Sequence, residues 1–75
     1  MKHTEKRLEY TSLLMREIRL TEKAINWFLK SYKFECDSYE WQICRLKHDI
    51  YIRESSKILG KAVDLGEELL KDYGN

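Results

Sequence analysis

Apolar residues recur at three- and four-residue spacing through the first half of the chain. No glycine or proline interrupts residues 4–34, and residue types that favour helices are frequent there. One stripe collects most of the apolar positions: Leu8, Thr11, Leu14, Met15, Ile18, Ile25, Phe28, Leu29 and Tyr32. The pattern predicts a helix over about residues 4–34, with this stripe as its main core face.

The three-and-four spacing of apolar residues is interrupted at about residues 35–37, and a second helical pattern begins after this interruption. Asp37 and Glu40 have the spacing of a capping box, which marks the start of a helix. From there, apolar and small residues alternate steps of three and four: Trp41, Cys44, His48, Tyr51, Ser55, Ile58, Ala62, Leu65 and Leu69. This heptad rhythm predicts one packed seam on a helix over about residues 38–72. A break or kink at Gly60, with a third helix after it, is the alternative.

A short turn between two long helices joins nearest neighbours in space, so the chain is expected to fold back on itself. Residues 1–75 are therefore predicted to form a single all-α domain, an antiparallel helical hairpin. At 9.1 kDa the chain lies near the lower size limit for independent stability, because small domains bury little of their surface.

A second apolar line lies on the other side of the first helix. Leu13, Leu20, Trp27 and Phe34, here called the Trp27 line, are spaced by seven, with Ala24 beside them. A two-helix hairpin buries one stripe of each helix, so this line would face water in a monomer. Pairing of two hairpins into a four-helix bundle, a partner protein, or a third helix folding back would each cover it. The leading hypothesis is a homodimer with the Trp27 line as its interface.

Composition narrows the function classes. Fourteen basic and 13 acidic residues give a net charge of +1, which excludes the strong global field of a dedicated nucleic-acid binder. The longest apolar runs are three residues, so no membrane span or signal peptide is expected. Two cysteines without a CxxC pattern indicate free thiols in a reducing compartment. We therefore expect a cytoplasmic protein that does not contact membranes.

Basic residues form one continuous stripe along the first helix. The members of this basic stripe are Arg16, Arg19, Lys23, Lys30 and Lys33. The stripe would run for roughly 25 Å beside the aromatic rings of Trp27 and Phe34, an arrangement that suits phosphates and stacked bases. An acidic protein partner, or a plain solvated face with Glu17 and Glu22 pairing to neighbours, would produce the same pattern.

The sequence contains only an incomplete metal-binding pattern and no recognised catalytic motif. Cys44 and His48 are four residues apart, with Glu40 one turn earlier and Cys36 in the turn, but four convergent ligands at a recognisable spacing are lacking. The chain has no glycine-rich phosphate loop, no G-x-S-x-G and no HExxH. We expect no metal, no cofactor and no enzymatic activity.

Together these patterns predict a small non-enzymatic interaction or regulatory protein. As a homodimer it would bind another macromolecule, protein partners foremost, and modulate it by inhibition or bridging. The alternative is a regulator that binds nucleic acid or a nucleotide through the basic stripe.

Overall fold

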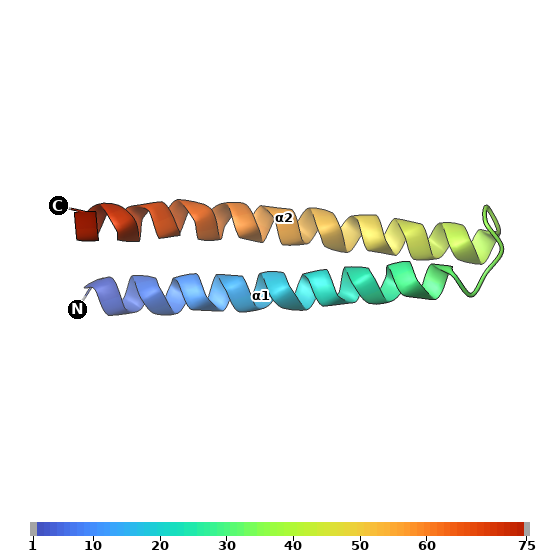
Figure 1. The fold of residues 1–75 in the computed structure, drawn as a ribbon, viewed down its shortest axis with the longest axis horizontal. Coiled ribbons are helices and arrows are strands. Elements are labelled where there is room, and N and C mark those ends of the chain that lie inside the picture. Colours follow the sequence, from blue (N-terminus) through green and yellow to red (C-terminus); the bar gives the residue numbers. More distant parts are fainter. Residues whose placement is uncertain (1, 75) are drawn as a thin grey trace.

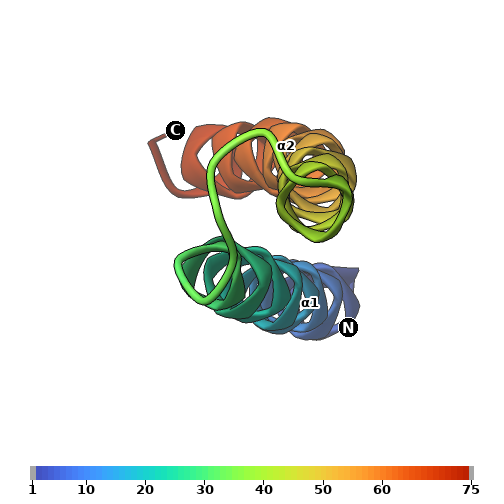
Figure 2. The ribbon, with the colours of Figure 1, turned by 90° about the vertical axis from the view of Figure 1, so that its right-hand side faces the viewer.

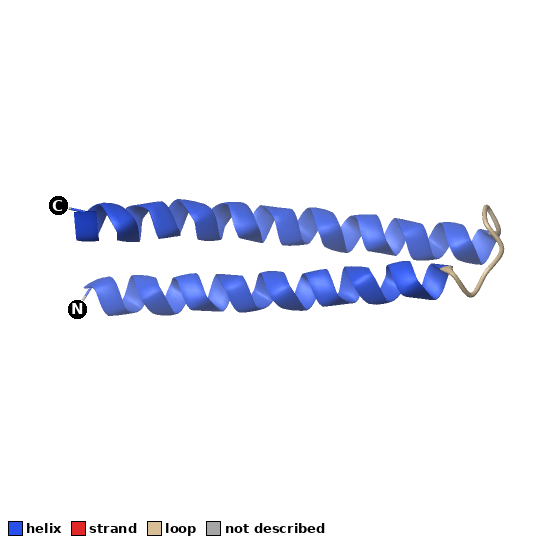
Figure 3. Cartoon of the chain, viewed as in Figure 1, coloured by secondary structure: helices blue, strands red, loops and turns tan. Residues whose placement is uncertain are grey.

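Two long helices make up nearly all of the structure. The computed structural model describes residues 2–74, in which α1 (Lys2–Ser31) and α2 (Tyr39–Gly74) are the helices and no strand occurs (Figures 1 and 3). The helices run antiparallel and side by side, so residues 2 and 74 lie at one end and the turn at the other. The resulting rod measures 55 × 14 × 13 Å. The predicted all-α hairpin is confirmed.

α2 is continuous through Gly60 and Gly66. A single glycine lowers the stability of a helix by about 1 kcal/mol relative to alanine. The packed seam keeps its three-and-four spacing on both sides of Gly60, and its contacts outweigh this cost. The alternative of a third helix beginning near Gly60 is therefore wrong for the described residues. No helix within residues 2–74 folds back over the hairpin, and Figure 2 shows the two helices packed only against each other.

The turn is longer than the sequence predicts, because α1 ends at Ser31 rather than near residue 34. The amides of residues 32–34 donate instead to carbonyls three residues earlier, in tighter turns of the 3₁₀ type. The Ser31 hydroxyl donates to the Phe28 carbonyl, a local bond that competes with the regular helical pattern. Residues 32–38 consequently connect the helices.

Ser38 is the N-cap of α2. The Trp41 N–H donates to Ser38 Oγ at 3.2 Å, and the Gln42 N–H donates to the Ser38 carbonyl at 3.0 Å. Asp37 lies just outside the helix with φ 66°, a left-handed conformation that aspartate adopts more readily than most residues. Its carbonyl accepts a bond from the Gln42 side chain. The N-cap thus lies one residue later than the capping box expected at Asp37 and Glu40, and Trp41 at the third helical position does not complete such a box.

The seam predicted on α2 is the one that packs against α1. Its members are all buried or half-buried: Trp41, Cys44, His48, Tyr51, Ser55, Ile58, Ala62, Leu65 and Leu69. Ala24 of α1 and Ala62 of α2 are 0% and 1% exposed, which lets the backbones approach closely. Within the part of the chain whose side chains are described, residues 4–71, no large side chain is fully buried. The core is a single narrow contact line between two helices.

Candidate interaction surfaces

The stripe expected to form the core face of α1 lies largely in solvent. Leu8 is 67% exposed and Tyr32 is 73% exposed, and Met15, Ile18, Ile25 and Leu29 are about half exposed. Leu14 and Phe28, at one edge of the stripe, are half-buried. The prediction of the α1 core face is therefore wrong. Most of the large apolar side chains of α1 are available to another molecule.

The side of α1 that faces α2 is the side that carries most of the Trp27 line. Leu13, Leu20 and Trp27 are half-buried there, and Ala24 between them is completely buried. Glu17 and Ser31 occupy the remaining positions of this three-and-four spacing. Because both are polar, a search for apolar residues does not detect the buried line in the sequence. Phe34 lies in the turn and is 36% exposed. The Trp27 line thus contacts α2 within the chain, while Trp27 and Phe34 also line an open groove of about 240 Å³ with Ile43. Its use as an interface between chains stays a prediction.

α2 extends the exposed apolar surface of α1 across the hairpin. Arg45 lies 4.9 Å above the Phe28 ring, and Gly66 contacts Tyr10, so both α2 residues lie on the same flank of the hairpin. Ile52 and Leu59 fall between them at seven-residue spacing and are exposed, as are Val63 and Leu70. We call this surface the apolar flank. Its exposed members are Ile18, Ile25, Leu29, Tyr32, Ile52, Leu59, Val63 and Leu70, whereas Leu8 and Met15 point away from α2 on the outer face of α1.

The apolar flank is raised near the turn. Phe28 and Tyr32 meet edge to face, with ring centroids 5.3 Å apart and an interplanar angle of 84°. Phe28 also contacts His48, with centroids 5.5 Å apart, and the Arg45 guanidinium covers it at 4.9 Å. These contacts fix Phe28, which in turn supports the exposed Tyr32 ring.

The opposite end of the apolar flank is hollowed. A cavity of about 510 Å³ opens over Gly66 and is lined by Tyr10, Val63, Leu69 and Leu70, with Arg7 and Glu67 completing the wall. A Cβ at Gly66 would come within 3.2 Å of the Tyr10 ring, so the absence of a side chain there lets the ring approach α2. We call this cavity the Gly66 hollow.

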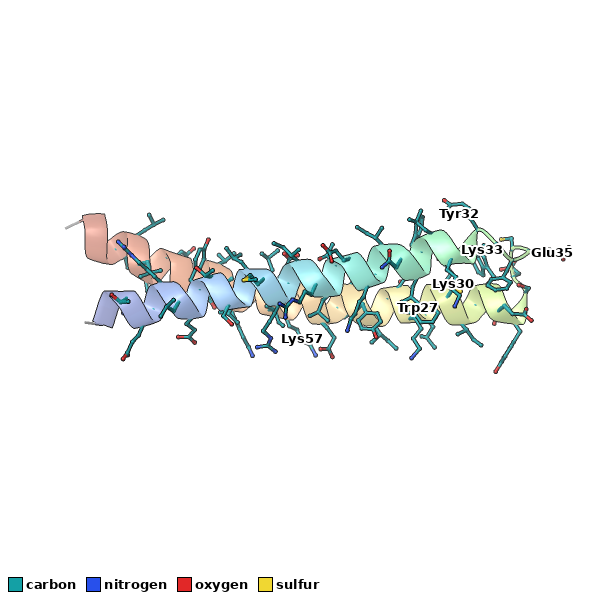
Figure 4. All side chains as sticks on the ribbon, turned by 90° about the horizontal axis from the view of Figure 1, so that it is seen from below. Trp27, Lys30, Tyr32, Lys33, Glu35 and Lys57 are labelled. Carbon is teal, nitrogen blue, oxygen red and sulfur yellow. The ribbon has the colours of Figure 1, made fainter. Side chains whose placement is uncertain are left out.

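The basic stripe lies on the other flank of the hairpin. The Lys30 Nζ lies 4.8 Å from the Trp27 ring centroid, and the Lys23 Nζ lies 5.7 Å from that of Tyr51. Tyr32 lies along one edge of the rod in Figure 4, with Trp27 and Lys57 toward the other. Within the described residues Arg16, Arg19 and Lys33 form no ion pair, so this flank keeps exposed positive charge.

Acidic residues of α2 interrupt the electrostatic field of the basic stripe. A groove of about 230 Å³ brings Glu54 beside Arg16, Arg19 and Lys23. A second hollow of about 390 Å³ places Asp64 and Glu68 with Arg16. Glu40 likewise lines a groove with Lys30 near the turn, so the flank is mixed in charge along its length. This alternation would weaken the binding of a long polyanion.

A polar cluster crosses the seam in the middle of the rod. The Thr21 hydroxyl donates to Glu17 Oε1 at 2.8 Å, and the Ser55 hydroxyl donates to the same oxygen at 3.1 Å. Polar groups in a helical seam are satisfied only in one alignment, so they restrict how the helices slide past each other. Sequence reasoning placed Ser55 in the seam but missed Glu17 as its partner.

Cys44 and His48, the thiol and imidazole that lie four residues apart, have different surroundings from Cys36. His48 Nδ1 contacts Asp49 Oδ1 at 3.1 Å, Cys44 is 2% exposed within the seam, and Cys36 is exposed in the turn. Among the described side chains, residues 4–71, no group of three or more His, Cys, Asp or Glu is arranged to bind a metal ion. Neither helix has a stretch long and apolar enough to cross a bilayer.

Comparison with known proteins adds no assignment. No protein-family model, curated protein or solved structure matches the chain.

Proposed function

We propose that the protein is a small non-enzymatic helical interaction protein. It pairs with a second copy into a four-helix bundle, and it binds and modulates another macromolecule through the surface left outside the bundle. The observation that carries this proposal is the apolar flank, which runs along both helices. Soluble monomers seldom leave a large contiguous apolar surface in water, and such a surface usually marks an interface. The free cysteines suit the cytoplasm.

The exposed area supports a second copy as the occupant of the apolar flank. The chain exposes 6126 Å², about 1,200 Å² more than the roughly 4,900 Å² of a compact monomer of 9.1 kDa. Stable interfaces of standard size bury about 800 Å² on each partner. Burial of one flank against its copy would remove about two thirds of this excess and would supply the second core layer that the narrow seam lacks.

Light scattering behind size exclusion tests the self-association, with Ile25→Lys as the disrupting variant. We expect wild type at twice the 9.1 kDa chain mass and Ile25→Lys at the single mass, because dimerisation would bury an unpaired charge. Asn26→Lys is the matched control, since it adds the same charge one residue further on, away from the apolar flank, and should remain dimeric. A monomeric wild type at about 100 μM, where a micromolar complex would be formed, or a dimeric Ile25→Lys would refute the proposal.

Binding of nucleic acid or a nucleotide is the second candidate function. Three observations favour it: Arg16, Arg19 and Lys33 form no ion pair among the described residues, the Trp27 ring lies beside Lys30, and the stripe lies away from the apolar flank. Single-stranded DNA or RNA would then bind with an affinity that falls steeply with salt, by nearly one unit of log–log slope for each phosphate neutralised. Absence of binding at low salt would exclude this function and leave an acidic protein as the target of the stripe.

A further inference from the structure

The two ends of the apolar flank have opposite shapes. At the turn end the Tyr32 ring stands on Phe28 and is 73% exposed. At the end opposite the turn, the Gly66 hollow provides about 510 Å³ of mostly apolar space. A protruding ring and a cavity on the same surface can fit together in a dimer. They do so when the turn end of each copy lies against the opposite end of its partner.

The spacing of these features matches such an arrangement. The Gly66 hollow lies at the level of Tyr10, and Thr21 lies at the middle of the rod opposite Ser55. Tyr10 and Tyr32 are each eleven residues from Thr21, or about 16 Å along the helix axis. A two-fold axis that crosses the interface at Thr21 therefore exchanges the position of Tyr32 with that of the hollow, while most of the two rods still overlap.

We infer that the second copy lies antiparallel on the apolar flank, with Tyr32 of each chain seated in the Gly66 hollow of the other. This inference rests on the proposed self-association and specifies its geometry. In a parallel pair the two Phe28–Tyr32 edges would crowd the same end of the interface, and both hollows would remain empty at the other. Close packing disfavours both outcomes, since voids forfeit contacts and overpacking forces side chains out of their rotamers.

The chemistry of the hollow suits a tyrosine. Val63, Leu69 and Leu70 would contact the apolar part of the ring, while the hydroxyl would remain near the wall formed by Arg7 and Glu67. A buried tyrosine usually retains a hydrogen-bond partner for its hydroxyl, and a carboxylate accepts such a bond. Among the described side chains the other strongly exposed tyrosine is Tyr39, which is 76% exposed but lies at the start of α2, outside the apolar flank.

Spin labels on Cys36 distinguish the two orientations. Cys36 is exposed in the turn, and Cys44→Ala leaves it as the single thiol. In the antiparallel dimer the labels lie at opposite ends, and we expect a separation above about 35 Å by pulsed dipolar spectroscopy. A dominant separation below about 20 Å would show a parallel dimer and would overturn the inference while leaving self-association intact. A monomeric mass with no dipolar coupling would instead refute the proposed function itself.

Two tyrosine variants test whether the Tyr32 ring occupies the Gly66 hollow of the partner. Tyr32→Ala should raise the dimer dissociation constant at least about tenfold, because buried aromatic anchors dominate interface energetics and the dimer contains two of them. Tyr39→Ala removes an equally exposed ring and should leave the dissociation constant unchanged. Equal dissociation constants for Tyr32→Ala and wild type, measured by sedimentation equilibrium, would show that Tyr32 occupies no pocket in the partner. Circular dichroism verifies that both variants stay helical.

Discussion

The Thr21 Oγ1 atom of α1 lies 2.9 Å from the Ser55 Oγ atom of α2, and both hydroxyls also contact Glu17 Oε1. The two hydroxyl hydrogens can satisfy only two of these three oxygen–oxygen contacts at a time. With the carboxylate accepting both, Glu17 holds the two helices together at this level. The cluster therefore fixes the alignment of the hairpin at its midpoint.

Loss of the Ser55 hydroxyl should weaken the hairpin measurably. We expect Ser55→Ala to lower the free energy of unfolding by about 0.5–1.5 kcal/mol relative to Ser56→Ala, as is typical for one intramolecular hydrogen bond. Both substitutions gain the same helix propensity, and Ser56 is exposed, so the comparison isolates the contact. Urea unfolding followed by circular dichroism gives both values. Equal stabilities would mean that the cluster adds nothing to the seam.

The two helices differed in how well their sequences revealed their buried sides. On α2 the seam is the only run that keeps the three-and-four rhythm from Trp41 to Leu69, and the structure buries it as predicted. On α1 the same rhythm passes through Glu17, Ala24 and Ser31, while larger apolar residues lie on the outer flank. A count of apolar positions therefore selected the wrong side. A hairpin buries only a narrow line, so small and polar residues can occupy much of it.

The signal that could have identified the correct side of α1 was present in the sequence. Leu13, Leu20 and Trp27 are spaced by seven, and Glu17 and Ala24 complete the alternating steps of three and four. The turn was harder to predict, because Asp37 and Ser38 are both good N-cap residues and only the backbone geometry chooses between them. Whether the apolar flank contacts a second copy depends on another molecule, which a hydrophobic pattern cannot identify.

The two glycines inside α2 should respond differently to alanine. At Gly60 a Cβ would meet nothing within 4 Å, so Gly60→Ala should stabilise the protein by about 0.5–1 kcal/mol through helix propensity. At Gly66 the Cβ would lie 3.2 Å from Tyr10 Cε2, and displacement of the ring should offset much of the same gain. Thermal unfolding of the two variants provides the comparison. A larger gain from Gly66→Ala would contradict the close contact with Tyr10.

The two cysteines should differ in reactivity in the folded protein. Cys36 is exposed in the turn, whereas Cys44 is 2% exposed between the helices. Ellman's reagent should therefore titrate one thiol per chain rapidly under native conditions and two thiols in denaturant. Cys36→Ser should remove the rapid phase and leave the slow one. Two rapidly reacting thiols would indicate that the seam near Cys44 opens readily.

Alanine at Trp27 and at Ile25 should separate the contact within the hairpin from the contact between hairpins. Trp27 is half-buried against α2, so Trp27→Ala should lower the free energy of unfolding by about 2–3 kcal/mol both below and above the dimer dissociation constant. Ile25 lies on the apolar flank and is about half exposed, so Ile25→Ala should cost little at low protein concentration.

The loss caused by Ile25→Ala should then grow as the protein concentration passes the dissociation constant, because association stabilises a folded chain by mass action. Unfolding curves recorded at several concentrations measure both variants. The opposite behaviour, with Trp27→Ala harmless in the monomer and costly only in the dimer, would assign the interface between chains to the Trp27 line. It would also require that the apolar flank be free in the dimer, because a single interface buries only one side of α1.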